Sequence, residues 1–132
     1  MTIALTCTAI LAALVFVLGF NVSRMRGVTA KAGGPQMPTD PADRLLIAQR
    51  AHGNAIEYVP TLIVLFLLVA LRQPAWWTAA LIIGATAARL LHATGMLNAR
   101  SLAERSRWRE IGAMGTYAFG LALAVVVLVS LW

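Results

Sequence analysis

The sequence is poor in charged residues and has almost no cysteine. Of its 132 residues, 12% are charged and 60% are hydrophobic, with one cysteine and five acidic residues. Soluble domains carry about twice that share of charge, so the composition argues against an ordinary globular protein. A single cysteine forms no internal disulfide. The chain also lacks histidine and cysteine ligands at a metal-site spacing, a glycine-rich phosphate loop after a strand, and a recognisable Ser/His/Asp arrangement.

Positive charge exceeds negative charge, and its distribution bears on the partner. The net charge is +6, which could suggest nucleic acid. The basic residues, however, gather in two short segments between long apolar runs and do not line one soluble face. A membrane-topology signal explains the same charges, so we do not expect a nucleic-acid partner.

The chain has four apolar regions, of which the run at residues 59–71 is too short to cross a bilayer alone and must be extended back to Pro41. A helix rises about 1.5 Å per residue, and the hydrocarbon core is about 30 Å thick. We therefore expect an all-α bundle of four transmembrane helices at about residues 2–25, 41–72, 75–98 and 108–132, forming one domain over residues 1–132. A cleaved signal peptide is a poorer interpretation of the first segment, because no basic region precedes it and the apolar run is too long.

The second helix has marked boundaries. Glycines and prolines between residues 33 and 38 are expected to hold the preceding loop open. We expect Asp40 to cap the helix, Pro41 to take the first helical position, and Asp43 to place negative charge in the first turn. At the other end, the pair at residues 73–74 (Gln-Pro) is expected to interrupt the chain before the third helix.

The distribution of lysine and arginine predicts the orientation. Loops one and three, with the adjoining helix ends, hold Arg24, Arg26, Lys31, Arg44, Arg100, Arg105, Arg107 and Arg109, whereas loop two holds Arg72. Because basic loops stay in the cytoplasm, we expect loops one and three to be cytoplasmic and both termini non-cytoplasmic. Trp132 would then lie at the opposite membrane interface.

Small residues recur at four-residue spacing in the last two helices. They are Ala80, Gly84 and Ala88 in the third helix and Gly112, Thr116 and Gly120 in the fourth. This spacing lets helix backbones approach closely in lipid, so we expect both helices to pack tightly against neighbours.

Polar side chains form a stripe along the second helix. Arg50, Asn54, Glu57 and Tyr58 are spaced i, i+4, i+7 and i+8, which places them on one face. A charge facing lipid costs roughly 2.5 to 3.5 kcal/mol at mid-membrane, so the stripe must meet protein or a wet cavity. Arg89 and His92 give the third helix a second polar face. Two interpretations remain. In the first, Arg50 and Glu57 neutralise each other inside the bundle and the two histidines are hydrogen-bonded packing residues. In the second, a polar anionic ligand binds to these side chains.

Residues 49–60 carry a family resemblance. They read Gln-Arg-Ala-His-Gly-Asn-Ala-Ile-Glu-Tyr-Val-Pro. The segment resembles the helix-two signature of the MAPEG family, the membrane-associated proteins in eicosanoid and glutathione metabolism, written R-A-x-x-N-x-x-E followed by an aromatic residue and a proline. The chain's length, helix number and basic loops are similar to that family along essentially all of the sequence, as in a divergent bacterial member.

The resemblance implies a homotrimer that binds glutathione between neighbouring subunits near the cytoplasmic side. It assigns glutathione contacts to Arg50, Asn54, Glu57 and Tyr58, with Arg50 holding a carboxylate and Glu57 the amino group. A neighbouring subunit would add Arg24 or Arg26 from the end of its first helix. Glutathione carries two carboxylates and one ammonium, which suits this set of side chains.

The resemblance also implies a thiol-activating arginine at the start of the fourth helix. We assign this role to Arg109, with Arg107 or Arg105 as the next candidates, because a nearby guanidinium lowers a thiol pKa. Arg89 and His92 resemble the R-x-x-H pair of the prostaglandin-synthase branch. The chain departs from the family pattern at three places. Met96 stands where eicosanoid-forming members have a tyrosine, and Ile47 stands where the family often has a basic residue. The loop between the third and fourth helices also looks longer than in those enzymes.

Three functions are compatible with these features. The first is a glutathione transferase or peroxidase that acts on lipophilic electrophiles entering from the bilayer. The second is a non-catalytic binder of glutathione or another anionic amphiphile. The third is a small transporter of lipophilic cations, although such exporters use a membrane-embedded carboxylate in helix one, and the first helix here has none. The electrophile cannot be read from the sequence.

Overall fold

The computed structural model describes residues 1–72 and 75–130. Over these residues the chain forms four helices and no strand: α1 (Thr2–Lys31), α2 (Arg44–Leu71), α3 (Thr78–Leu97) and α4 (Arg107–Val129). Each helix is long and apolar enough to cross a membrane. The predicted all-α, four-helix membrane fold is therefore confirmed.

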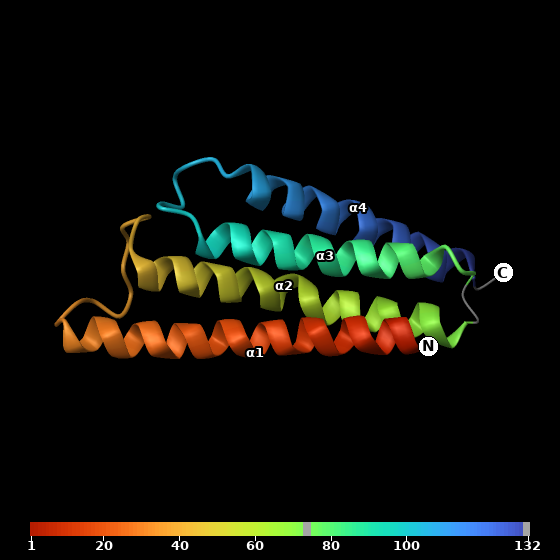
Figure 1. Cartoon of the computed structure of the whole chain (residues 1–132), viewed down its shortest axis with the longest axis horizontal. Coiled ribbons are helices and arrows are strands. Elements are labelled where there is room, and N and C mark those ends of the chain that lie inside the picture. Colours follow the sequence, from red (N-terminus) through yellow and green to blue (C-terminus); the bar gives the residue numbers. More distant parts are fainter. Residues whose placement is uncertain (73–74, 131–132) are drawn as a thin grey trace.

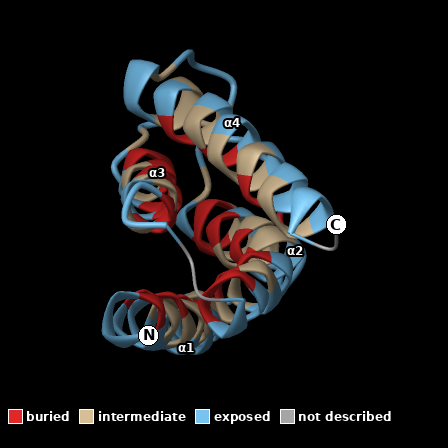
Figure 2. Cartoon of the chain, turned by 90° about the vertical axis from the view of Figure 1, so that its right-hand side faces the viewer, coloured by how far each residue is buried: buried red, intermediate tan, exposed pale blue. Residues whose placement is uncertain are grey.

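The four helices lie side by side along one long axis (Figure 1). The N-terminus and the end of α4 lie at one end of the bundle, whereas the α1–α2 and α3–α4 loops lie at the other. Helix α2 contacts α1, α3 and α4. Buried residues face the interior between the helices, and the outer surfaces of α1 and α4 are exposed (Figure 2). These surfaces carry large apolar side chains, including Phe16, Phe20 and Leu121, as expected of surfaces in contact with acyl chains.

Helix α1 is longer than predicted. It continues to Lys31 instead of ending near residue 25, because residues 26–31 contain no proline that would end the helix. The helix stops where Gly33 adopts a φ of 69°, a left-handed conformation that glycine accepts without steric cost. The backbone N–H of Gly34 then donates to the Thr29 carbonyl at 2.9 Å, which satisfies one of the last carbonyls of α1.

The predicted start of α2 was wrong by about one turn. Asp43 is the N-cap, and its carboxylate accepts from the backbone N–H groups of Leu45 and Leu46 at 2.7 and 3.2 Å. Asp40 instead accepts from Ala42 N–H at 2.9 Å in a local turn. The Pro41 carbonyl accepts from Leu102 N–H at 2.8 Å, so it is engaged by the α3–α4 loop and not by α2.

The other helix ends lie close to the predicted ones. Helix α3 begins at Thr78, three residues later than expected, after a turn in which the Thr78 hydroxyl donates to the Ala75 carbonyl at 2.8 Å. Helix α4 begins at Arg107 with Ser106 as its N-cap and ends at Val129. The predictions for residues 73–74, and for Trp132 at the membrane interface, fall outside the described residues.

Helices α3 and α4 pack backbone against backbone, as the small-residue spacing predicted. A Cβ placed on Gly112 would lie 2.5 Å from the backbone nitrogen of His92, and one on Gly95 would lie 2.8 Å from that of Arg109. One on Gly84 would lie 2.5 Å from the Phe119 ring. The stripe is shorter than predicted, because Ala80 is exposed. This close approach brings the first turns of α4 against the end of α3, which carries His92.

Candidate functional site

A polar cleft of about 330 Å³ opens beside α2, near the end of the bundle that carries the α3–α4 loop. It is lined by Gln49, Arg50, Gly53, Asn54 and Glu57 of α2, His92 and Met96 of α3, Leu102 of the loop, and Arg109 of α4. Its volume lies at the lower end of the range of small-molecule sites. The cleft thus unites five of the predicted site residues: Arg50, Asn54, Glu57, His92 and Arg109.

Arg50 and Glu57 are the two charged residues that α2 contributes to the cleft. Both are exposed, and neither forms a side-chain hydrogen bond or an ion pair with any residue in the described ranges 1–72 and 75–130. The mutual neutralisation considered from the sequence is therefore not present in this part of the chain. Two charges of opposite sign thus line one cleft without an ion pair in the described part of the chain, and on a transmembrane helix such groups are kept away from lipid.

Arg89 is buried behind the cleft. Its side chain is 1% exposed, and its Nη2 donates to the Asn54 side-chain oxygen at 2.8 Å and to the Asn54 carbonyl at 3.4 Å. Its guanidinium carbon lies 5.3 Å from the centroid of the Tyr58 ring, within range of a cation–π interaction. Arg89 can only donate hydrogen bonds, so the side-chain oxygen of Asn54 must face Arg89. The N–H donors of the Asn54 amide therefore remain available to the cleft.

Tyr58 contacts Tyr117 of α4 and, like Asn54, lies against Arg89. Its hydroxyl lies 3.3 Å from that of Tyr117 on α4, and the two ring centroids are 5.7 Å apart at an interplanar angle of 56°. Tyr58 is not among the residues that line the cleft. The sequence reasoning missed Tyr117, and its available signal was a lone hydroxyl-bearing aromatic residue in an otherwise apolar stretch of α4.

His92 joins α3 to the start of α4. Its Nδ1 lies 2.8 Å from the backbone carbonyl of Arg109. A carbonyl only accepts, so Nδ1 carries the proton, and in the neutral ring Nε2 is an acceptor. His92 is thus both a buried packing residue and part of the wall of the cleft.

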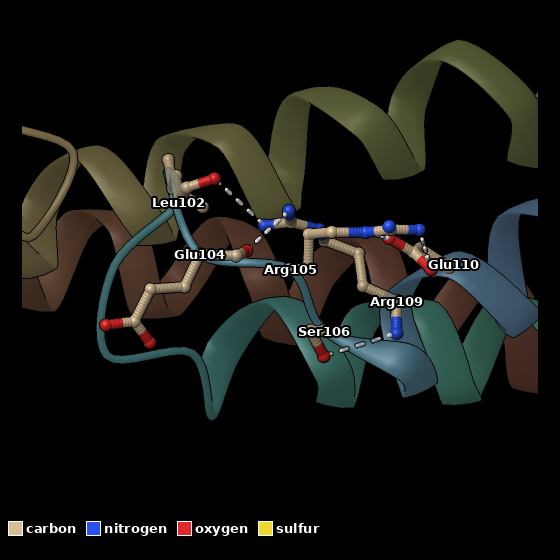
Figure 3. A network of polar contacts seen from close by, with 6 residues as sticks. All are labelled: Leu102, Glu104, Arg105, Ser106, Arg109 and Glu110. Atoms are coloured by element: carbon tan, nitrogen blue, oxygen red, sulfur yellow. Dashed lines mark hydrogen bonds and ion pairs between the residues drawn. The ribbon is translucent and has the colours of Figure 1, made fainter.

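The three arginines around the start of α4 differ in what they contact, and Figure 3 shows two of them, Arg105 and Arg109. Arg109 lines the cleft and donates to the carbonyls of Leu102 and Glu104 at 3.3 and 3.0 Å. Arg105 donates twice to the Glu110 carboxylate at 2.8 and 3.1 Å, and this carboxylate raises the pKa of the exposed Arg105 guanidinium. Arg107 is exposed. Of the three candidates, Arg109 is the one in the wall of the cleft.

Arg24 and Arg26 lie on α1, which contributes no side chain to the cleft lining. Arg24 donates to the Asn21 side-chain oxygen at 3.1 Å and borders a different groove. Arg26 is exposed, and its carbonyl accepts from Gln36 at 3.3 Å. A single chain therefore does not bring either arginine to the other predicted site residues.

The sequence analysis also missed part of the cleft lining. Gln49 and Gly53 each precede a residue of the predicted stripe by one position. A strict i, i+4 pattern omits them, but both line the cleft. Leu102 lies in an irregular loop, where helical periodicity gives no signal. Met96 also lines the cleft. Its thioether therefore lies in the cleft wall at the position where eicosanoid-forming members of the family have a tyrosine.

Comparisons with known proteins identify a family for the chain. The model of the MAPEG family matches residues 4–129. The chain is 36% identical over 86 residues to the inner membrane protein YecN of Escherichia coli K12, and equally to YecN of Escherichia coli O6:H1. The match covers 64% of this chain and 60% of each relative, so the chain spans less than two thirds of the relatives' length. No solved structure matches the chain significantly.

Proposed function

The chain belongs to the MAPEG family, and from this premise we propose that it binds glutathione in the polar cleft beside α2. The observation that carries the proposal is the pair Arg50 and Glu57, which line the cleft without a counter-charge in the described part of the chain. A ligand that carries both signs of charge would satisfy the two residues together. The relatives are named inner membrane proteins, and we propose the same location for this chain.

The polar groups of the cleft match the charges of glutathione. Arg50 offers a planar fork of donors to a carboxylate, and the Asn54 amide, held by Arg89 with its N–H donors free, adds a further donor. Glu57 is the acceptor for the ammonium group. Because the fixed Asn54 amide offers only donors to the cleft, a carboxylate lies beside it, whereas the ammonium lies one turn further along α2.

A homotrimer would complete the site. Arg50 and Glu57 are exposed in a single chain, although they lie on a transmembrane helix, so a neighbouring subunit that covers the mouth of the cleft would keep them from lipid. That neighbour would contribute Arg24 or Arg26 of its α1. Arg26 is the better placed of the two, since Arg24 already borders the groove between α1 and α2.

We further propose that Arg109 activates the thiol. A guanidinium near the sulfur lowers the thiol pKa and raises the thiolate fraction. The thiol proton leaves to water, and the thiolate attacks an electrophilic carbon of a lipophilic substrate from the bilayer. A carbon–sulfur bond forms while the bond to the leaving group breaks. With a hydroperoxide, the thiolate would instead attack oxygen, the O–O bond would break, and a second glutathione would complete the reduction.

Binding without catalysis is the second candidate, and two observations favour it. The Arg109 guanidinium donates to the Leu102 and Glu104 carbonyls, so it serves the loop as well as the cleft. Met96 provides no hydroxyl group in the cleft wall. A protein of this kind would bind glutathione through Arg50, Asn54 and Glu57 and leave the thiol protonated.

Titration of purified protein with glutathione separates the two candidates. Calorimetry measures binding, and ultraviolet difference absorbance measures thiolate. Arg50→Ala and Glu57→Gln should each weaken binding by about 1.5 to 3 kcal/mol, the range for hydrogen bonds to charged groups, which corresponds to roughly ten- to a hundredfold in Kd. Arg109→Ala should retain binding and lose the thiolate signal.

Arg72→Ala is the matched control, because Arg72 follows the far end of α2. It should bind glutathione as the unaltered protein does. Full affinity in both Arg50→Ala and Glu57→Gln would refute glutathione binding at this cleft. Binding without any thiolate signal in the unaltered protein would favour the non-catalytic candidate.

A further inference from the structure

A second groove, of about 630 Å³, lies between α1, α2 and the end of α3. It shares none of its lining residues with the polar cleft. It lies toward the end of the bundle that carries loops one and three, since it is lined by residues late in α1, early in α2 and at the end of α3. Of the residues proposed to contact glutathione, only Arg24, the less well placed of the two α1 candidates, borders this groove.

The lining of the groove changes from apolar to cationic along α1. Val17 and Phe20 of α1 form an apolar part, Asn21 follows, and Arg24 and Arg44 border the groove nearer the loop end, where Leu97 ends α3. Residues 17 and 24 are separated by about 10 Å along the helix axis. This depth is enough for the upper part of an acyl chain, an ester group and a phosphate to lie in sequence along α1.

The two arginines of this groove lack a carboxylate partner in the part of the chain that the structure describes. Arg24 donates to the neutral side-chain oxygen of Asn21 at 3.1 Å. Arg44 donates to the carbonyl of Ala99 at 3.2 Å. A guanidinium has five N–H donors, so both side chains retain donors and full positive charge for a ligand.

We propose that this groove binds an anionic phospholipid of the adjacent leaflet. The phosphate lies between Arg24 and Arg44, a glycerol ester carbonyl accepts from the Asn21 amide, and an acyl chain lies along Val17 and Phe20. Basic pockets between transmembrane helices recognise anionic headgroups through such contacts. The apolar part distinguishes a lipid from free phosphate, which would gain nothing from it.

Charge complementarity favours a lipid over a second copy of the chain. The sequence has eleven basic residues against five acidic ones, and none of the acidic residues lies in α1. A second copy would therefore bring mostly further positive charge to a groove that already holds two arginines. Arg24 and Arg26 lie about 200° apart around a helix, so a lipid on Arg24 leaves Arg26 free for the other face of α1.

Native mass spectrometry of the full-length protein tests the proposal. Delipidated protein in neutral detergent is titrated with phosphatidylglycerol, and in parallel with zwitterionic phosphatidylcholine. We expect tight binding of phosphatidylglycerol that the double variant Arg24→Gln/Arg44→Gln weakens at least tenfold, with phosphatidylcholine binding weak and unchanged. Val17→Trp, which fills the apolar part without changing charge, should weaken phosphatidylglycerol binding as well.

The control is Arg26→Gln/Arg100→Gln, which removes the same charge from loops one and three at positions that do not line this groove. It should bind phosphatidylglycerol as the unaltered protein does. An equal loss in this control would show general attraction to a basic surface and overturn the proposal. Unchanged affinity in the Arg24/Arg44 double variant would overturn it too. A smaller assembly mass in that variant would identify the groove as a contact between copies, which is also incompatible with the proposal.

Discussion

Gly112 carries the closest approach between α3 and α4, and its replacement by alanine gives a quantitative test of the structure. A Cβ at this position would lie 2.5 Å from the His92 backbone nitrogen and 2.7 Å from its Cα. Backbone atoms do not rotate away as a side chain does, so α4 must withdraw from α3 by about 1 Å to restore van der Waals separation.

The expected cost follows from two opposing effects. Overpacking against a rigid neighbour destabilises a protein by about 1 to 3 kcal/mol, and backbone contact belongs at the upper end. Replacing a helical glycine with alanine returns about 1 kcal/mol. We therefore expect Gly112→Ala to lose about 2 kcal/mol of stability, measured by denaturant titration in mixed micelles and followed by circular dichroism.

Two further glycines make a graded series. A Cβ on Gly115 would lie 3.0 Å from the Ala88 Cβ, and one on Gly27 would meet nothing within 4 Å. Gly115→Ala should therefore cost less than Gly112→Ala, and Gly27→Ala should stabilise the protein by roughly 0.5 to 1 kcal/mol. Equal effects of all three substitutions would refute the backbone-to-backbone packing described for α3 and α4.

The Gly112 substitution should also reach the candidate site. It separates the helices where His92 Nδ1 donates to the Arg109 carbonyl at 2.8 Å, and both residues line the cleft. We expect glutathione to bind more weakly to Gly112→Ala than to Gly115→Ala. Unchanged affinity in a destabilised Gly112→Ala protein would show that the spacing of α3 and α4 does not set the shape of the cleft.

Two other substitutions probe single contacts. Arg89→Lys removes the guanidinium whose Nη2 donates to both oxygens of Asn54, so glutathione binding should weaken by about 1 to 2 kcal/mol in calorimetry while helicity is retained. Unchanged affinity would remove Arg89 from the positioning of Asn54. Asp43→Ala removes the cap that accepts from Leu45 and Leu46 and should cost about 1 kcal/mol of unfolding free energy, whereas Asp40→Ala, which loses only a turn contact, should cost less.

The sequence was informative where one physical rule dominated. Long apolar segments, in α2 extended through a polar first half, predicted four transmembrane helices, because a bilayer core satisfies no backbone polar group. Small residues at four-residue spacing predicted the approach at Gly84 and Gly112 because small side chains are what allow it. The start of α2 was misjudged because two aspartates compete as caps, and the choice depends on a hydrogen bond from Leu102, which lies far away in the sequence.

The site was predictable as a set of residues but not as an arrangement. Periodicity placed Arg50, Asn54, Glu57 and Tyr58 on one stripe, yet a stripe about 100° wide can divide between two environments. Here Arg50 and Glu57 border the cleft, whereas Tyr58 contacts Tyr117 and lies beside Arg89. Which side of the stripe faces which neighbour depends on the packing of α3 and α4, and that packing is not encoded in the period of one helix.

The division of the stripe explains why a fully buried arginine is retained in α3. Burying a charge costs several kcal/mol unless polar groups compensate it, and Arg89 receives the Asn54 oxygens and the Tyr58 ring as compensation. In return, Arg89 fixes the Asn54 amide with its donors toward the cleft and its acceptor away from it. Arg89 and His92, three residues apart, therefore act on different sides of one wall. His92 lines the cleft, and Arg89 holds the Asn54 oxygen from behind it, which leaves the Asn54 N–H donors toward the cleft.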